Sequence, residues 1–291
     1  MESALESWTV KDLSRPARLQ DILPLLAGDW IPSNKGCKKA IERGRVLLNA
    51  AKCDTGNWVH NGDRVTLLQA ELTPSVAIPV PIQIGYQDDA VVVVWKPAGL
   101  HTSGSHKTSL RAQVAAMMSP TPKLDYLTHP EPAHRLDYAT SGWVIFGRTS
   151  YALNFLNNEF KNERIRKYYL AVVHGNSPEK LKINLPLENK PASTFATCWA
   201  RGPIPTRGEG SLLHITTGTG RTHQIRKHLH SIHHGIVGDD RYKSEQHYKG
   251  HGLLLCAYQI EFQHPISTEL ITLKGEVPRK FNRFRWVKNL L

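Results

Sequence analysis

Short apolar segments with the composition of β-strands follow one another from residue 82 onward, and only two helical patterns interrupt them. The segments with strand character are 82–87, 91–95, 142–150, 167–175, 182–187, 194–202, 210–218, 252–262 and 268–273. Helical spacing of apolar residues marks 150–165 and 221–235. Because strands and helices do not alternate regularly, we predict an α+β fold with a mixed, mainly antiparallel sheet and flanking helices.

A proline-rich stretch separates this region from a smaller N-terminal unit. Residues 71–81 read ELTPSVAIPVP and have the composition of a linker. Before them, helical patterns cover 18–30 and 33–44, with Ser33 as the expected N-cap, and short strand-like segments follow. We therefore expect three parts, which are an N-terminal extension (1–15), a small α/β domain (16–75) and the large α+β domain (76–291).

The charge of the chain favours a polyanionic partner. Lysine and arginine outnumber aspartate and glutamate by 37 to 25, which gives a net charge of +12. No apolar run approaches the length of roughly 20 residues that spans a bilayer. The N-terminus lacks the apolar core of a secretory signal, and the four cysteines are scattered without a CxxC pair. These features predict reduced thiols, no membrane partner and a cytoplasmic location.

The stretch HRLDYATSG, residues 134–142, places Asp137 just before a strand that enters the core. Asp, Thr, Ser and Gly are good turn residues, and Arg135 could pair with the carboxylate. Composition alone favours the turn. The same carboxylate could also be a salt-bridge partner, a metal ligand or a nucleophile.

Further segments resemble those of a known family. TGTGRTHQIRKHL (217–229) and KYYLAVVHG (167–175) combine with HRLDYATSG to resemble the pseudouridine synthases, in the branch that includes the large-subunit ribosomal RNA enzymes. The resemblance extends to KPAGL (96–100), GIVGDDRY (235–242) and LLLCAYQIEFQHP (253–265), in the expected order. It covers essentially all of residues 82–285.

The resemblance implies isomerisation of uridine to pseudouridine in RNA, a reaction that needs no metal or cofactor. It places Asp137 as the catalytic carboxylate, which could attack C1′ or C6 or assist a glycal route. It makes Arg226 the cation that keeps this carboxylate charged and oriented. Tyr169 would stack on the uracil or relay a proton, while Tyr168, on the other strand face, would pack in the core.

RNA contacts are expected around this centre and in the N-terminal unit. Because a target uridine must leave its stack, Arg135 would fill the vacated space or hold a phosphate, and His134 would hydrogen-bond the loop. Arg221 is a further expected RNA contact. The N-terminal unit is similar to the α-L RNA-binding motif, with candidate contacts at Lys35, Lys38, Lys39, Arg43 and Arg45. An ordinary solvated helix face is the alternative there.

We expect a monomer that binds RNA, not DNA, with ribosomal RNA slightly preferred over transfer RNA.

Three other interpretations are weaker. The histidines at 223, 228, 230, 233 and 234 suggest zinc, but their spacing puts them on different helix faces. SGSH at 103–106 suggests a serine hydrolase, but the G-x-S-x-G elbow is missing. A non-catalytic RNA-binding or ribosome-assembly protein is the functional alternative, which the presence of Asp137, Tyr169 and Arg226 disfavours. Cys256 departs from the resemblance, because the family commonly has histidine there, and we expect the change to affect packing or a contact with a residue that supports the site.

Overall fold

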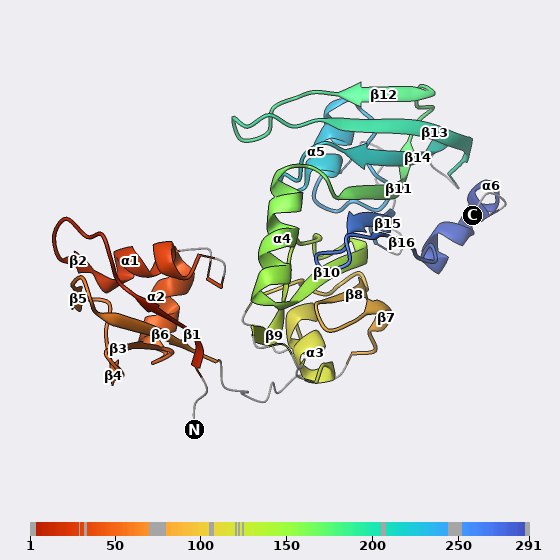
Figure 1. Cartoon of the computed structure of the whole chain (residues 1–291). Helices are drawn as coiled ribbons and strands as arrows, with labels where there is room; N and C mark the ends of the chain where they lie inside the picture. The colour runs from red at the N-terminus through yellow and green to blue at the C-terminus, as the bar shows by residue number, and fades with distance from the viewer. Residues whose placement is uncertain are drawn as a thin grey trace.

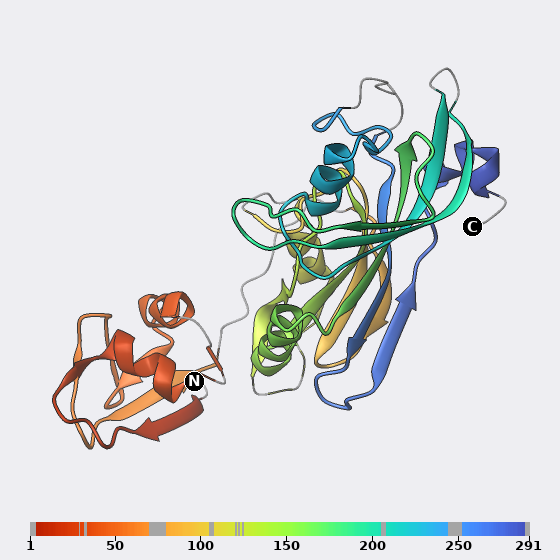
Figure 2. The same ribbon diagram turned by 90° about the horizontal axis from the view of Figure 1, so that it is seen from above.

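The computed structural model describes residues 4–28, 30–31, 34–69, 80–104, 108–119, 121, 123, 125–204, 208–243 and 252–288. Ser33, the linker through residue 79 and the second half of SGSH lie outside the described residues. Figure 1 and Figure 2 both show residues 4–69 gathered apart from the elements that follow residue 80. Each group has its own set of buried apolar side chains.

The N-terminal unit combines two helices with a four-stranded sheet of order β1-β6-β3-β4. Its elements are β1 (Ala4–Thr9), β2 (Ala17–Arg18), α1 (Leu19–Leu26), α2 (Asn34–Glu42), β3 (Val46–Leu48), β4 (Ala51–Lys52), β5 (Trp58–Val59) and β6 (Arg64–Leu68). Strand β1 was expected in a separate extension, but it pairs antiparallel with β6. The following Val10 is buried in this unit's core, and that burial explains why the segment joins the sheet.

One ten-stranded sheet dominates the rest of the chain (Figure 1). The main path runs β12-β13-β14-β11-β15-β10-β8-β7, with β16 beside β15 and β9 beside β10. The strands are β7 (Gln83–Gln87), β8 (Val91–Lys96), β9 (Tyr126–Pro132), β10 (Ser141–Thr149), β11 (Arg166–His174), β12 (Lys180–Ile183), β13 (Thr194–Pro203), β14 (Glu209–Thr217), β15 (Leu255–Gln263) and β16 (Leu270–Lys274). The predicted α+β class with a mainly antiparallel sheet is confirmed.

The sheet is mixed because β10 and β15 run parallel, with Ser141 opposite Cys256 and Gly142 opposite Ala257. Gly142 has a φ of +142°, and a Cβ there would lie 2.3 Å from the carbonyl oxygen of Ala257. Only glycine allows this approach, which brings the strand after Asp137 against the centre of the sheet.

Helices cover both faces of the sheet around β8. Val91 and Val93 pack with α4 (Ser150–Lys161), whereas Val92 and Val94 belong to the cluster that includes α3 (Leu110–Met117). The run VVVV is therefore continuously apolar because both of its faces are buried. Helix α5 (Gln224–Ser231) starts next to the end of β14, and none of the described helices is long and apolar enough to cross a membrane.

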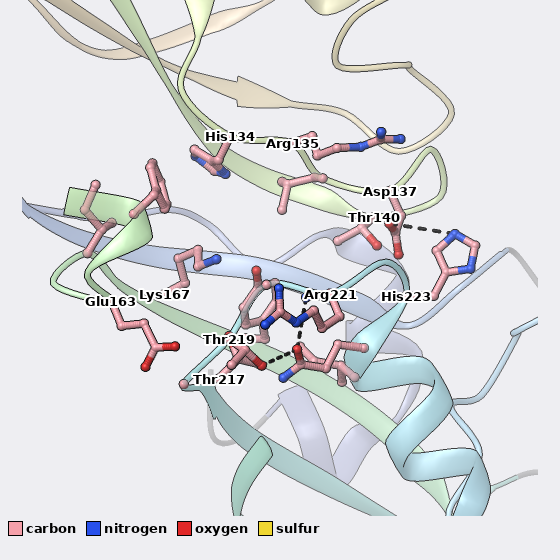
Figure 3. A pocket seen from close by; sticks show the side chains of 18 of the residues that line it. His134, Arg135, Asp137, Thr140, Glu163, Lys167, Thr217, Thr219, Arg221 and His223 are labelled. Atoms are coloured by element: carbon pink, nitrogen blue, oxygen red, sulfur yellow. Dashed lines mark hydrogen bonds and ion pairs between the residues drawn. The ribbon is translucent and has the colours of Figure 1, made fainter. Parts of the chain in front are cut away.

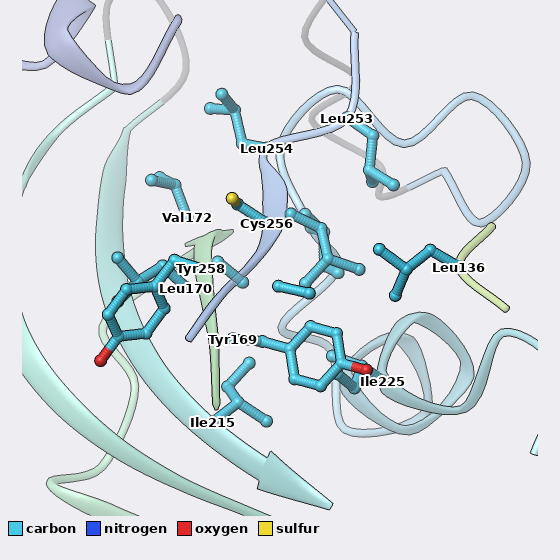
Figure 4. Close-up of a cluster of buried hydrophobic side chains, with 14 of the residues drawn as sticks. Leu136, Tyr169, Leu170, Val172, Ile215, Ile225, Leu253, Leu254, Cys256 and Tyr258 are labelled. Carbon is cyan, nitrogen blue, oxygen red and sulfur yellow. The ribbon is translucent and has the colours of Figure 1, made fainter. Parts of the chain in front are cut away.

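The C-terminal segment packs against the core of the large sheet. The 3₁₀ helix η1 (Arg279–Arg283), α6 (Arg285–Lys288) and Phe284 between them bury Phe281, Phe284 and Val287 in the same cluster as β11 and β15. The side chain of Cys256 lies in this cluster too, fully buried (Figure 4). Burial raises the pKa of this thiol to about 12, so that it stays protonated. Its expected role in packing is consistent with this position.

Candidate active site

A pocket of about 650 Å³ is lined by the end of α4 with the residues that follow it, by Leu255 of β15 and by four further segments. These are the loop 133–140 before β10, the start of β11, the loop 217–221 after β14 and the first turn of α5 (Figure 3). The three segments that carried the resemblance, far apart in the sequence, thus line one cavity. Asp137, Tyr169 and Arg226 all contribute to its wall.

Hydrogen bonds hold the loop that carries Asp137. The N–H of Thr140 donates to the Asp137 carbonyl at 3.0 Å, which closes a turn. The hydroxyl of Thr102 bonds both the N–H and the carbonyl of Leu136, at 3.2 and 3.1 Å. The turn predicted from composition therefore forms through the backbone, and it leaves the Asp137 carboxylate 22% exposed at the pocket.

Arg226 joins two carboxylates. Its Nη1 lies 3.7 Å from Oδ2 of Asp137. Its Nε and Nη2 donate to the two carboxylate oxygens of Asp239, at 2.8 and 2.7 Å. The Asp239 side chain is only 1% exposed. This bidentate contact fixes the plane of the guanidinium, so that its remaining edge faces Asp137.

The carboxylate of Asp239 accepts hydrogen bonds from the backbone as well as from Arg226. Its Oδ1 also accepts the backbone N–H groups of Arg241 and Tyr242, both at 3.0 Å. Burial alone would raise the pKa of Asp239, but the hydrogen bonds from Arg226 and from the backbone lower it below its ordinary value. Sequence reasoning did not assign this residue a role, although it lies in the GDDRY stretch that carried the resemblance.

His223 approaches Asp137 from the other side. It precedes α5 in a left-handed conformation with φ of 56°, and its Nε2 lies 3.8 Å from Oδ1 of Asp137. Its Nδ1 is 3.1 Å from the hydroxyl of Tyr242. Burial lowers the pKa of His223, although the charge of Asp137 acts to raise it. The ring is therefore mostly neutral at pH 7.

Tyr169 forms the apolar floor of the pocket. Its ring is 8% exposed and belongs to the same cluster as Leu136 and Ile225 (Figure 4). Burial, followed by the nearby charge of Asp137, raises the pKa of the phenol, which keeps its proton. Tyr168 points to the opposite face, where its hydroxyl donates to Glu261 at 3.1 Å and its ring stacks on His214. The expected packing role of Tyr168 is consistent with these contacts.

The other expected RNA contacts near the pocket differ in exposure. Arg135 is exposed at the rim, and Arg221 is exposed with its Nε donating to the Pro191 carbonyl at 3.2 Å. His134 Nε2 accepts the N–H of Ile145 at 3.2 Å, so its bond goes to strand β10. Gln224, which sequence reasoning missed, accepts the Thr219 hydroxyl at 2.6 Å and thereby fixes the loop 217–221.

The N-terminal candidates do not reach this pocket. Lys35, Lys38 and Lys39 are exposed on one face of α2, and Arg43 is exposed just after it. Arg45 differs, because its Nε and Nη2 both donate to the Leu68 carbonyl, at 3.2 and 2.9 Å. Burial lowers the pKa of Arg45, and its guanidinium ties β3 to the end of β6.

The histidine cluster does not assemble a metal site among the described residues. His228 is fully buried, with Nδ1 2.9 Å from the Thr194 hydroxyl and Nε2 2.9 Å from the Leu185 carbonyl. Both of its nitrogens are used within the fold, so it anchors α5 to the neighbouring strand.

Lys96, in the KPAGL stretch, is a buried support of the Asp137 loop. Its amine donates to three backbone carbonyls, those of Pro97 at 3.0 Å, Leu100 at 2.8 Å and Tyr138 at 3.2 Å. Burial lowers the pKa of Lys96 to about 7, although the charge of Asp137 acts to raise it. The lysine therefore links the residue after Asp137 to the end of β8.

The free energy of unfolding of the wild-type protein, relative to Lys96→Met, should rise with pH between about 7 and 10.5. In this window the unfolded lysine keeps its proton while the folded one releases it, so stability increases by up to about 1.4 kcal/mol per pH unit. Urea unfolding of both proteins at pH 7 and pH 9 measures the difference. A difference that does not change with pH would contradict the buried lysine's titration.

Comparisons with known proteins agree with the geometry. Residues 90–231 match the family model described as RNA pseudouridylate synthase. An uncharacterized RNA pseudouridine synthase of Synechocystis is 31% identical over 277 residues, covering 86% of this chain and 83% of the relative. The ribosomal large subunit pseudouridine synthase D of Nitrosomonas europaea is 27% identical, covering 93% of this chain and 84% of the relative.

Two further relatives extend this picture. The tRNA pseudouridine synthase C of Vibrio parahaemolyticus is 29% identical, covering 73% of this chain and 99% of the relative. The solved structure of human RNA pseudouridylate synthase domain containing 1 shares the fold, with a TM-score of 0.57 and 22% identity over 69% of this chain and 84% of that one. From the match to the Synechocystis relative over most of both lengths, the chain belongs to the RNA pseudouridine synthases, the enzymes that isomerise uridine in RNA.

Proposed function

We propose that Asp137 is the catalytic carboxylate of this synthase, that Arg226 is its cationic partner and orients it, and that Tyr169 supports the uracil ring. The observation that carries the proposal is the chain of charges from Asp239 through Arg226 to Asp137. Asp239 uses both of its oxygens on Arg226, whereas Asp137 keeps an exposed edge towards the pocket. A carboxylate that a guanidinium orients at the wall of a pocket is suited to nucleophilic or base catalysis.

In the C1′ route, a carboxylate oxygen of Asp137 bonds C1′ as the N1–C1′ bond breaks with its electron pair on the uracil, and C5 later displaces that oxygen from C1′. In the glycal route, Asp137 takes the 2′ proton as the N1–C1′ bond breaks and returns it to C2′ when C5 bonds to C1′. In the C6 route, the carboxylate first adds to C6, the N1–C1′ bond then breaks, and the bond from the carboxylate to C6 breaks after C5 has bonded to C1′. In every route the base turns before C5 bonds to C1′, and at the end the proton on C5 is released while N1 takes up a proton. Tyr169 would offer an apolar face on which the detached ring can turn without leaving the pocket.

The substrate uridine enters this pocket out of the RNA stack. Arg135, exposed beside Asp137, would occupy the space that the base leaves or hold a neighbouring phosphate. Arg221, exposed on the opposite wall, would hold a second phosphate. His134 completes the expected set, as a pocket residue fixed to β10.

Large-subunit ribosomal RNA is our proposed target, with transfer RNA second. Relatives are named for both substrates, and a ribosomal RNA enzyme matches over more of this chain than the tRNA enzyme does. Pseudouridine mapping by chemical modification and reverse transcription, in cells with and without the gene, tests the choice. A site that disappears from transfer RNA alone would overturn the ribosomal assignment. A monomeric enzyme in the cytoplasm would fit such a substrate.

We propose that the N-terminal unit is a domain separate from the larger catalytic domain. It would bind RNA through the exposed lysines of α2. Replacing Lys35, Lys38 and Lys39 by glutamine should weaken RNA binding. It should also reduce the slope of log affinity against log salt by roughly one for each phosphate that these lysines no longer neutralise. Filter binding at salt concentrations from about 50 to about 300 mM measures both the RNA affinity and its slope against salt.

The matched control for this test replaces three exposed lysines of the large sheet, Lys180, Lys182 and Lys274, by glutamine. The net charge changes equally, but affinity and slope should stay near the wild-type values. Equal effects of the two triple variants would mean that overall charge, and not α2, determines binding.

A further inference from the structure

Lys167 is a cation in the pocket that the proposed mechanism leaves unused. It precedes Tyr169 by two residues on β11, so both side chains project from the same strand face. Figure 3 shows its side chain inside the pocket, and its amine lies 5.4 Å from the centroid of the Phe160 ring. A Cβ built on Gly220, in the opposite loop, would be 3.7 Å from this amine.

No hydrogen bond or ion pair joins the Lys167 amine to another described residue, which distinguishes it from its cationic neighbour. Arg226 is occupied by Asp239 and Asp137. The ionisable groups that share the pocket with Lys167 are Tyr169, Arg226, His134, Arg135, Asp137, Lys161, Glu163, Arg221 and His223. A half-buried ammonium without a fixed partner is costly in free energy unless a ligand supplies one.

Every route to pseudouridine places negative charge on the uracil. When the N1–C1′ bond opens, its electron pair stays on the ring and is shared between N1 and the two carbonyl oxygens. When Asp137 adds to C6 instead, the displaced pair moves to O4. A cation aimed at these oxygens stabilises the transition state more than the neutral ground state, which is the requirement for catalysis.

We propose that the Lys167 ammonium binds a carbonyl oxygen of the target uracil and stabilises the negative charge that develops on the detached ring. The inference rests on the proposed function of Asp137 and Tyr169. Residues two apart on a strand are separated by roughly 6.6 Å, so a ring lying on Tyr169 presents one edge to Lys167. Asp137 lies on the loop that faces Lys167 and Tyr169, where its carboxylate can reach the ribose.

The titration of Lys167 provides a signature. Burial lowers its pKa to about 8, against the raising effect of Glu163, while burial and the charge of Lys167 lower the pKa of His134 well below its ordinary value. The ammonium is thus present at pH 7 and deprotonated as the pH rises through 8. The rate constant of the chemical step should fall over this range in the wild-type enzyme.

Single-turnover kinetics of Lys167→Met test the proposal. The substrate is RNA labelled with [5-³H]uridine in cells that lack the gene, because tritium is released when C5 bonds to C1′. The rate constant at saturating enzyme should fall by about 100- to 1,000-fold, as for loss of one oxyanion donor, with RNA affinity within about threefold of wild type. The decline above pH 8 should disappear from the residual activity. Lys182→Met, an exposed lysine of β12, is the matched control and should react like the wild type.

Three outcomes would overturn the role of Lys167 while leaving that of Asp137 intact. An unchanged rate constant would exclude a part in the chemical step. Weaker RNA binding with a smaller salt slope, but an unchanged rate at saturation, would identify Lys167 as a phosphate contact. A lower melting temperature with a rate constant and pH profile like those of the wild type would make it structural. Loss of all activity in Lys167→Met together with full activity in Asp137→Asn would instead overturn the proposed function.

Discussion

Asp137→Asn should abolish pseudouridine formation while leaving RNA binding within about threefold of the wild-type affinity. The amide has the shape of the carboxylate, but it is neither charged nor nucleophilic, so the rate constant should fall by at least about 1,000-fold. The fold should survive, because Arg226 keeps its bidentate contact with Asp239 and the turn at Asp137 is made by the backbone. Tritium release from [5-³H]uridine RNA and filter binding measure the two effects separately.

Asp89→Asn is the matched control for this variant. Asp89 is an exposed carboxylate between β7 and β8, and it does not line the pocket. It should retain the wild-type rate. Turnover by Asp137→Asn at a rate near that of the wild type would contradict the role of Asp137 as the catalytic carboxylate. If the wild-type protein also formed no pseudouridine in any cellular RNA, the alternative of a non-catalytic RNA-binding protein would have to replace the enzyme.

The sequence predicts the strands of the large sheet well where their burial is simple. Val91–Val94 are continuously apolar because both faces are covered, and this pattern is readable without a structure. Strand β12 shows the limit. It was expected over 182–187 but lies at Lys180–Ile183, because its pairing with Ala196 and Thr197 on β13, a contact distant in sequence, sets its register.

Among the elements that escaped prediction, β9 and α3 did so for different reasons. Strand β9 (Tyr126–Pro132) contains two prolines, which argue against a strand. Among the described strands it pairs with β10 alone, so its other side is an edge where proline is tolerated. Helix α3 (Leu110–Met117) is short and weakly amphipathic, and it starts at Ser109, whose hydroxyl accepts the N–H of Ala112 at 3.3 Å. This capping serine is the signal that could have located it.

The site illustrates what spacing alone leaves open. Asp137, Tyr169 and Arg226 are singled out by the motifs that carry them, and the structure brings them to one pocket. The motifs do not reveal that Arg226 is shared between two carboxylates, because Asp239 reaches it only through the packing of the segment after α5. That second contact changes how the arginine must be tested.

Arg226→Ala would lower both activity and stability, and the two losses have different causes. The activity is expected to fall by at least about 100-fold, because Asp137 loses the cation that pairs with it and orients it. The stability is expected to fall by about 3–5 kcal/mol, because Asp239 is left as a buried carboxylate without its counter-charge. A single variant therefore cannot separate a catalytic arginine from a structural one.

The double variant Arg226→Met with Asp239→Asn separates the two. The asparagine oxygen can still accept the backbone N–H groups of Arg241 and Tyr242, and no buried charge remains, so much of the missing stability should return. The activity should stay as low as in Arg226→Met, because the cation beside Asp137 is still absent. Urea unfolding and single-turnover tritium release are measured for Arg226→Met, Asp239→Asn and the double variant. The two measurements give the coupling energy between these residues for stability and for activity. Recovery of activity in step with stability would show that Arg226 serves only to neutralise Asp239.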